Sequence, residues 1–234
     1  MLILEMTDDL MMNQSALINT PWDTVAFGLN TYELANVADY ALRQAAQTPG
    51  HHTVRVDPLA SKQLLYKYGF YYCDTLIEPY CTAEKLKIQT HPDCSITKSV
   101  DWLELLPICH GAFEHGRFHR DFNLDHECAD TRYDNWLRQL YDKQNVYGLL
   151  WSNGLAGFIA YSGNSLLLHA VDKAYRGQGL AKYWWGAVCS ELFAAGHKEV
   201  KSSISAASMG ALNLYASLGF GFRNPADIYH LLVK

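Results

Sequence analysis

The segment 165–195 constrains the fold of this chain most strongly. An apolar run that contains Leu166, Leu167 and Leu168 and continues to Val171 predicts a strand buried on both faces. From Leu180 onward, apolar side chains recur at helical spacing. A loop with two glycines connects these stretches, so the sequence predicts a strand, a tight turn and a helix in direct succession.

The glycine loop has the residue types that an anion-binding turn needs. Gly177 and Gly179 let backbone N–H groups converge without a Cβ between them, at the positive end of the predicted helix dipole. Such amides suit a pyrophosphate, and we expect a Cβ at Gly179 to block its approach. The loop lacks the Lys-Ser/Thr pair of a P-loop and the third glycine of a dinucleotide fold. An ordinary glycine-containing loop remains the structural alternative.

Strand and helix patterns alternate along the rest of the chain, which predicts an α/β (α+β) fold. We expect further helices at 36–47, 58–68, 100–112, 130–141 and 208–218. Further strands are expected at 52–56, 70–80, 95–97, 146–151, 155–161, 199–204 and 228–233, with an Asn153-Gly154 hairpin turn. A polar stretch at 85–93 is interpreted as a hinge, which divides the chain into domains 1–90 and 91–234.

Charge and composition exclude several classes of protein. A formal net charge of -5 and a pI near 6.0 leave no basic face for a nucleic acid. The acidic N-terminus has no signal-peptide pattern, and no apolar run is long enough to span a membrane, so we expect a cytoplasmic protein that binds no membrane. The cysteines and histidines match no standard ligand spacing, so no metal is expected.

Two segments of the chain resemble each other. A strand at 52–56 is followed by a helix and Gly69-Phe70, and a strand at 199–204 is followed by a helix and Gly219-Phe220. This similarity indicates either two related α/β units or a common strand-helix-Gly-Phe arrangement that arose independently.

The loop and a second motif together resemble the GCN5-related N-acetyltransferase (GNAT) superfamily. Arg176, Gly179 and Ala181 fit the R/Q-x-x-G-x-G/A loop that binds coenzyme A in that family. The family's second motif, approximately N-x-x-A-x-x-L-Y-x-x-x-G-F, is matched by Ala211, Leu214, Tyr215, Gly219 and Phe220. The usual asparagine is replaced by Ser208, whose hydroxyl can cap the helix or reach the cofactor arm less far.

The resemblance implies a GNAT fold, a mixed central sheet with flanking helices, and acetyl-CoA as the cofactor. Residues 168–171 would leave the neighbouring strand and offer backbone N–H groups to the acetyl oxygen and the pantetheine arm. The implied cofactor residues are Leu168, His169, Ala170, Val171, Arg176, Gly177, Gln178, Gly179, Leu180, Ala181, Lys182, Ser208 and Tyr215.

Two side chains are candidates for catalysis. By the resemblance, Tyr215 lies near the cofactor sulfur and donates a proton to the departing thiolate; packing beneath Gly219-Phe220 is the structural alternative. His169 can act as the base that deprotonates the amine, directly or through water, because imidazole titrates near neutral pH. A histidine that only bonds a neighbour in the sheet is the alternative.

The acceptor site is expected in the connection between the helices at 100–112 and 130–141. Arg117 can pair with phosphate oxygens, and Phe118 or Trp136 can stack on a base or sugar; the alternative is that they only hold the helix pair together. With Asp121, this string resembles acyltransferases of nucleotide-linked amino sugars, notably the dTDP-fucosamine acetyltransferases, as does Trp22-Asp23-Thr24-Val25-Ala26-Phe27-Gly28.

The first 90 residues lack the glycine loop and carry Leu65 where Tyr215 would stand, so we expect a degenerate GNAT-like unit that binds no coenzyme A. The resulting hypothesis is an N-acetyltransferase (class EC 2.3.1) that acetylates a small amine, such as a nucleotide-linked amino sugar, by direct transfer in a ternary complex. Another amine, such as an amino acid, polyamine or drug, or a non-catalytic acyl-CoA-binding regulator, are the alternatives. The oligomeric state is open, with a homodimer among the options.

Overall fold

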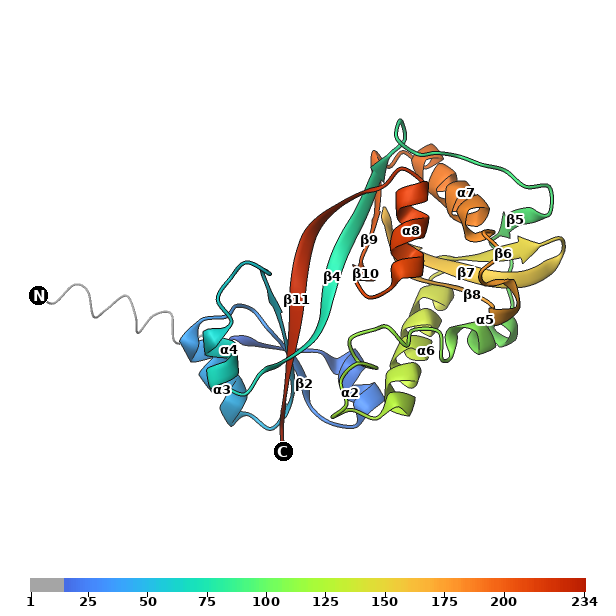
Figure 1. The fold of residues 1–234 in the computed structure, drawn as a ribbon. Coiled ribbons are helices and arrows are strands. Elements are labelled where there is room, and N and C mark those ends of the chain that lie inside the picture. The colour runs from blue at the N-terminus through green and yellow to red at the C-terminus, as the bar shows by residue number, and fades with distance from the viewer. Residues whose placement is uncertain (1–14) are drawn as a thin grey trace, which may run out of the picture. The chain divides into compact units, whose positions relative to one another are not determined.

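The computed structural model describes residues 15–234, and the N-terminal segment searched for a signal peptide lies almost wholly outside them. The described residues form two compact units. Unit 1 comprises residues up to Cys73 together with Asp227–Lys234, and unit 2 comprises Asp74–Ala226. Figure 1 shows the elements of both.

Unit 2 is built on a mixed sheet with the strand order β11, β4, β9, β8, β7, β6, β5. The strands β5 to β8 pair antiparallel, whereas β8 and β9 pair parallel. A short strand, β10, pairs with β4 beside this path. The bounds are β4 (Tyr71–Thr82), β5 (Cys94–Thr97), β6 (Val146–Trp151), β7 (Gly154–Ser162), β8 (Ser165–Val171), β9 (Glu199–Ser202), β10 (Ile204–Ser205) and β11 (Gly221–Val233).

Helices lie on both faces of the unit 2 sheet, α7 and α8 on one side of β6 to β8 and α5 and α6 on the other (Figure 1). Trp184, Val188 and Leu192 repeat at helical spacing along α7 and are buried against the sheet, each contributing about 1.5–3 kcal/mol of hydrophobic stabilisation. The bounds are α5 (Trp102–Cys109), α6 (His126–Asp142), α7 (Ala181–Ala194) and α8 (Met209–Ser217).

Unit 1 has a smaller sheet in the order β1, β2, β3, β11. Leu42 and Ala45 on α3 are fully buried, and they belong to one apolar core with Val54 of β3 and Leu65 of α4. The bounds are β1 (Leu17–Asn19), β2 (Thr31–Leu34), β3 (Gly50–Val56), α2 (Pro21–Phe27), α3 (Asp39–Gln47) and α4 (Gln63–Lys67).

The long strands β4 and β11 each contribute to both units. β4 begins in unit 1 and pairs in unit 2 with β9, where Cys81 lies opposite Val200. β11 begins in unit 2 and pairs in unit 1 with β3, where Tyr229 lies opposite Val54. The chain thus contains a strand, a helix and a second strand in this order twice: β3, α4 and β4 in one series, and β9, α8 and β11 in the other. The second strand of each series pairs with the first strand of the other. The boundaries between the two compact units therefore lie at other positions than residue 90.

Three local features differ from the sequence-based expectations. The helix expected from Pro58 starts only at Gln63, because Lys62 Nζ donates to the carbonyls of Asp57, Pro58 and Ala60 and holds a turn there. The final strand begins at Gly221 rather than at residue 228. In the β6–β7 turn the positive φ belongs to Ser152 (53°), not to Asn153-Gly154.

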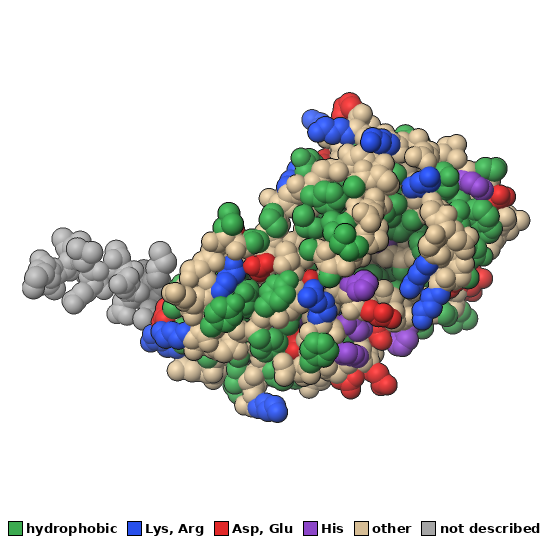
Figure 2. All heavy atoms as spheres, in the orientation of Figure 1, with side chains coloured by type: hydrophobic (Ala, Val, Ile, Leu, Met, Phe, Trp, Pro, Cys, Tyr) green, Lys and Arg blue, Asp and Glu red, His purple; other side chains and the backbone are tan. Residues whose placement is uncertain are grey.

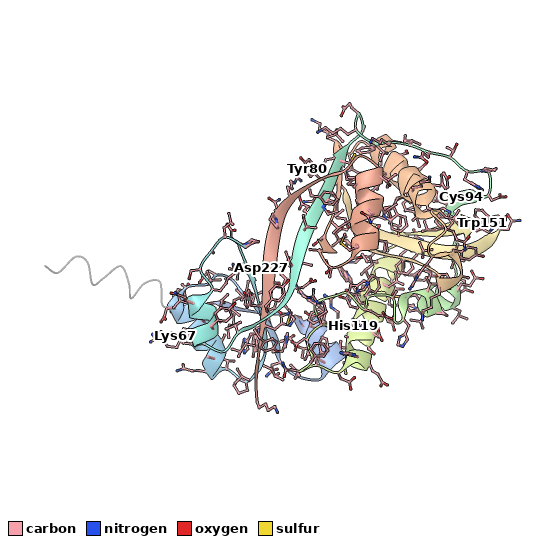
Figure 3. All side chains as sticks on the ribbon, viewed as in Figure 1. Lys67, Tyr80, Cys94, His119, Trp151 and Asp227 are labelled. Carbon is pink, nitrogen blue, oxygen red and sulfur yellow. The ribbon has the colours of Figure 1, made fainter. Side chains whose placement is uncertain are left out.

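The β5–β6 pair forms one edge of the unit 2 sheet, where Cys94 and Trp151 lie opposite each other (Figure 3). No helix among residues 15–234 is both long enough and apolar enough to cross a membrane.

Candidate active site

The site is organised by the separation of two parallel strands. β8 and β9 pair at only two positions, Ser165 with Lys201 and Leu166 with Ser202. Within residues 15–234 their pairing ends there, because the chain after Ser202 turns to β10, which pairs with β4 instead. β8 continues to Val171 and remains paired with β7 on its other side. The backbone from Leu168 to Val171 therefore faces a gap in the sheet on the side of β9.

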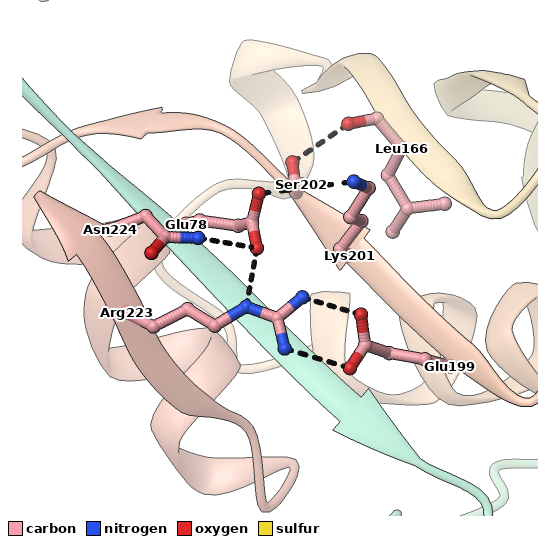
Figure 4. Close-up of polar contacts among 7 residues, drawn as sticks. All are labelled: Glu78, Leu166, Glu199, Lys201, Ser202, Arg223 and Asn224. Carbon is pink, nitrogen blue, oxygen red and sulfur yellow. Dashed lines mark hydrogen bonds and ion pairs between the residues drawn. The ribbon is translucent and has the colours of Figure 1, made fainter.

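Polar side chains fix both ends of β9 (Figure 4). At its end, Ser202 Oγ donates to the Leu166 carbonyl at 2.8 Å, across the last paired position before the strands separate. At its start, Arg223 of β11 makes a bidentate ion pair with Glu199, with N···O distances of 2.9 and 2.6 Å. The same guanidinium donates through Nε to Glu78 of β4 at 2.6 Å. β9 is thus held at both of its ends, up to the position where it separates from β8.

The glycine loop follows β8 directly and leads into α7. Gly177 and Gly179 have φ values of 76° and 72°, a conformation that glycine adopts without strain. Side chains brace the loop from outside: Asp172 accepts from the Ala174 N–H at 2.8 Å, and Gln178 donates to the Ala174 carbonyl at 2.7 Å. The backbone conformation, rather than crowding, is what requires glycine, because nothing lies within 4 Å of a Cβ placed at either glycine.

The backbone amides from Gly177 to the first turn of α7, residues 177–182, have no acceptor among the described residues. The loop residues 176–179 are exposed, and the amides of 180–182 form the first turn of α7, whose dipole favours an anion. Arg176 is exposed as well, and its Nε donates to the Val171 carbonyl at 2.7 Å. Amides in this arrangement suit an anionic group such as a phosphate.

The structure brings Tyr215, His169 and Trp185 together. Tyr215 of α8 is fully buried, and its hydroxyl lies 3.1 Å from Nε2 of His169 on β8. Trp185 of α7 donates through Nε1 to the same hydroxyl at 3.4 Å. His169 stands in the part of β8 that has separated from β9, so the phenol lies beside the gap between the strands.

Burial fixes the protonation of this pair at neutral pH. Desolvation raises the pKa of Tyr215 well above its usual range, so the phenol keeps its proton. Desolvation also lowers the pKa of His169 to about 4, so the imidazole is neutral. A neutral phenol can donate a proton and a neutral imidazole can accept one, and the two groups are in contact.

The residues expected to contact the acceptor differ in how far they are buried. Phe118 and Asp121 are buried at 2% and 1% exposure, whereas Arg117 and Trp136 are partly exposed. The guanidinium carbons of Arg117 and Arg132 lie 4.8 and 4.9 Å from the centre of the Phe118 ring, which therefore packs against two cations. Figure 2 shows histidine and acidic side chains gathered over α6 and the α5–α6 connection, where His119, labelled in Figure 3, bonds Asp130 at 2.9 Å.

Sequence reasoning missed Trp185 and one buried polar cluster. Trp185 stands beside Trp184 and outside the apolar spacing of the predicted helix, which was the available signal. Asp74 of β4 is fully buried and accepts from Arg120 Nη1 at 2.7 Å and from Ser205 Oγ at 2.8 Å. No sequence pattern joins these three positions. Ser208 lies at the N-cap of α8, but its side chain makes no capping bond.

Residues 124–227 match the family model described as "Acetyltransferase (GNAT) domain". Over this segment the chain is similar to a GNAT domain. The match begins within the connection before α6 and ends in β11, so it includes the separated strands, the glycine loop and Tyr215. A comparison with curated protein sequences gave no match.

Solved structures show that the chain has the mixed α/β GNAT fold. A GCN5-related N-acetyltransferase from Sphaerobacter thermophilus is 11% identical with a TM-score of 0.65, covering 92% of this chain and 75% of that one. An acetyltransferase of the GNAT family from Novosphingobium aromaticivorans is 15% identical with a TM-score of 0.54, covering 95% and 98%. A tandem GNAT protein from the clavulanic acid biosynthesis pathway is 11% identical with a TM-score of 0.54, covering 87% and 77%.

Proposed function

We propose that this protein transfers the acetyl group of acetyl-CoA to a primary amine of a small molecule. The observation that carries the proposal is the contact of Tyr215 with His169 beside the gap between β8 and β9. The loop that follows β8 and leads into α7 is exposed at residues 176–179. A thioester carrier bound along the loop and the gap would bring its carbonyl to this pair.

The amides supply the binding and polarisation that the reaction needs. N–H groups of residues 177–182 would hold the pyrophosphate, and those N–H groups of 168–171 that point away from β7 would bond the pantetheine arm and polarise the thioester carbonyl. Attack by the amine nitrogen on that carbonyl forms the amide and expels the thiolate. Tyr215 donates the proton that the thiolate requires, since burial keeps its phenol neutral.

The chain favours direct transfer over an acyl-enzyme. Cys189 lies on α7 within the same core as Tyr215, but it is fully buried. Burial also raises the pKa of the Cys189 thiol to about 12, so the nucleophilic thiolate is not formed at neutral pH. This supports the proposal that the amine attacks the thioester itself, in a ternary complex.

An amino sugar, including a nucleotide-linked one, is the narrower form of the proposal for the acceptor. Arg117 and Trp136, partly exposed on the α5–α6 connection and α6, offer a cation for a phosphate and a ring for stacking. The buried Phe118 and Asp121 would support them rather than touch the acceptor. One solved structure of this fold is a glucosamine N-acetyltransferase region of a fungal GH3 β-N-acetylglucosaminidase, with 12% identity and a TM-score of 0.54.

Tyr215→Phe tests the proposal. We expect thiol release from acetyl-CoA to fall at least tenfold with the preferred amine, because the thiolate loses its proton donor. Coenzyme A affinity measured by calorimetry should stay within about threefold. Tyr40→Phe, at an exposed tyrosine of unit 1, is the matched control and should keep full activity.

A panel of amino sugars, sugar nucleotides, amino acids and polyamines would identify the acceptor class. Activity confined to free amines would refute the amino-sugar form. Coenzyme A binding without turnover of any amine would instead favour a non-catalytic regulator.

A further inference from the structure

We propose that His169 acts behind Tyr215 as a proton store, so that the phenol alone both takes a proton from the amine and returns one to the thiolate. This inference rests on the proposed acetyl transfer and assigns its proton path. His169 is then a positioning residue rather than the base that meets the amine.

The imidazole of His169 meets the phenol through one ring nitrogen. Nε2 of His169 faces the Tyr215 hydroxyl at 3.1 Å. In the proposed proton path the ring hydrogen lies on Nδ1, the nitrogen that does not face the phenol. A neutral imidazole with its hydrogen on Nδ1 has a lone pair on Nε2. Nε2 therefore accepts, and the phenol O–H donates.

Trp185 and Ser202 border the other side of the hydroxyl. Trp185 Nε1 is a donor only, so at 3.4 Å it directs its N–H to the Tyr215 oxygen. Ser202 also contacts the hydroxyl, but its own hydrogen goes to the Leu166 carbonyl, so Ser202 donates nothing to the Tyr215 oxygen. With the phenol hydrogen on His169 and one lone pair engaged by Trp185, the other lone pair has no donor among these neighbours. Tyr215 thus meets an incoming amine as an acceptor, with a base behind it.

The protons balance over one turnover. The amine nitrogen attacks the thioester carbon, which gives an intermediate with a protonated nitrogen and an oxyanion. That nitrogen gives its proton to the Tyr215 oxygen while the phenol proton moves to Nε2, leaving an imidazolium. When the C–S bond breaks, the thiolate takes the proton from the Tyr215 oxygen and Nε2 returns its own. Amide and free thiol leave, and both side chains regain their starting state.

The imidazolium exists only while the site carries a negative charge. Desolvation disfavours a charged His169 in the empty protein, which leaves the neutral form ready to accept. The oxyanion, and then the thiolate, would stabilise the cation beside them. The same burial favours return of the proton once that charge has gone.

The variants His169→Gln and His169→Leu separate proton storage from orientation. A glutamine amide can accept the phenol hydrogen bond but cannot carry the proton. We expect both variants to lose at least tenfold in kcat, with coenzyme A affinity unchanged within about threefold. Adding Tyr215→Phe to either should cost no more than another twofold, because both residues serve one path. His197→Gln, outside the site, is the matched control.

Two further measurements decide the proton path. Rates in mixtures of light and heavy water should show two transferring protons for the wild type and one for His169→Gln. The ¹⁵N shift of Nε2 should report an unprotonated nitrogen that changes in Tyr215→Phe. A protonated Nε2, a glutamine variant within threefold of the wild type, or additive losses would overturn the proton store while leaving acetyl transfer intact. Coenzyme A binding without transfer to any amine would overturn both.

Discussion

Tyr215 is a buried tyrosine whose hydroxyl lies within hydrogen-bonding distance of His169 and Trp185. Its ring packs edge to face on Phe220 at a centroid distance of 4.9 Å, which fixes the phenol independently of the bonds at its oxygen. His169 and Trp185 reach that oxygen from two different elements. A single substitution at any of the three therefore changes the chemistry without removing the packing of the other two.

Burial of His169 predicts a specific dependence of stability on pH. Its pKa is about 4 in the folded chain and about 6.5 when unfolded, so the unfolded state binds the proton first as the pH falls. The contribution is fully present above pH 6.5 and is lost between pH 6.5 and 4. We expect the wild type to lose on the order of 3 kcal/mol more than His169→Gln across this range.

Denaturant unfolding of the wild type and His169→Gln at several pH values measures the difference in their free energies of unfolding. The contributions of the carboxylates cancel in this difference, because both proteins contain them. Equal losses in the two chains would show that the imidazole is not desolvated as the structure has it.

The residues of the site were partly predictable. Tyr215, His169 and the loop glycines stand at fixed distances along the sequence from a strand or helix, so local patterns find them. The contacts of Tyr215 with His169 and Trp185 join three elements, β8, α7 and α8, whose relative placement is a property of the packed sheet. The same applies to Asp74, Arg120 and Ser205, since a buried ion pair leaves no periodic trace in a sequence.

At the scale of elements, the strand β8, the loop and the helix α7 were predicted within a residue or two, because each is set by apolar period and glycine. α4 was not, because Lys62 Nζ bonds the carbonyls of Asp57 and Pro58 and holds a local turn there, and such a turn leaves no periodic pattern in the sequence. The separation of β8 from β9 depends on where β10 finds its partner, which is β4, far away in sequence. The separation of β8 from β9 could therefore not be predicted from local sequence patterns.

Replacing glycine by alanine should lower the stability of the protein in the glycine loop and raise it in helix α8. Gly179→Ala puts a Cβ on a residue with φ of 72°, which costs about 1–2 kcal/mol or shifts the loop. Gly210→Ala, in α8 and also without an atom within 4 Å, should stabilise by up to about 1 kcal/mol.

Chemical unfolding measures whether each variant is less or more stable than the wild type. Calorimetry with coenzyme A should show weaker binding for Gly179→Ala only. Unchanged affinity in that variant would separate the loop amides from the pyrophosphate.

At the scale of the whole molecule, the two units share a plan in which strand, helix and strand recur and the last strands are exchanged. The sequence similarity around Gly69-Phe70 and Gly219-Phe220 marks the matching helix ends, and both glycines have positive φ, 82° and 89°. The exchange itself could not be predicted, because strand partners depend on sheet edges and not on strand sequence.

The exchange predicts that the fragments 1–90 and 91–234 do not fold separately. The first lacks the residues of β11 that pair with β3, and the second lacks β4, which stands between β11 and β9. Each sheet would lose a strand and expose unpaired backbone. We expect collapsed amide spectra by NMR for either fragment alone. Mixing the two should restore dispersed signals, whereas dispersed spectra from the separate fragments would contradict the shared sheets.

The distance along the chain between β3 and β11 also orders events during synthesis. Residues 227–233 of β11 are the partners of β3, and every element from α4 to α8 is synthesised between these two strands. One edge of β3 therefore stays open while those elements emerge from the ribosome. During that interval the growing polypeptide is exposed to chaperones and to mispairing with nascent neighbours.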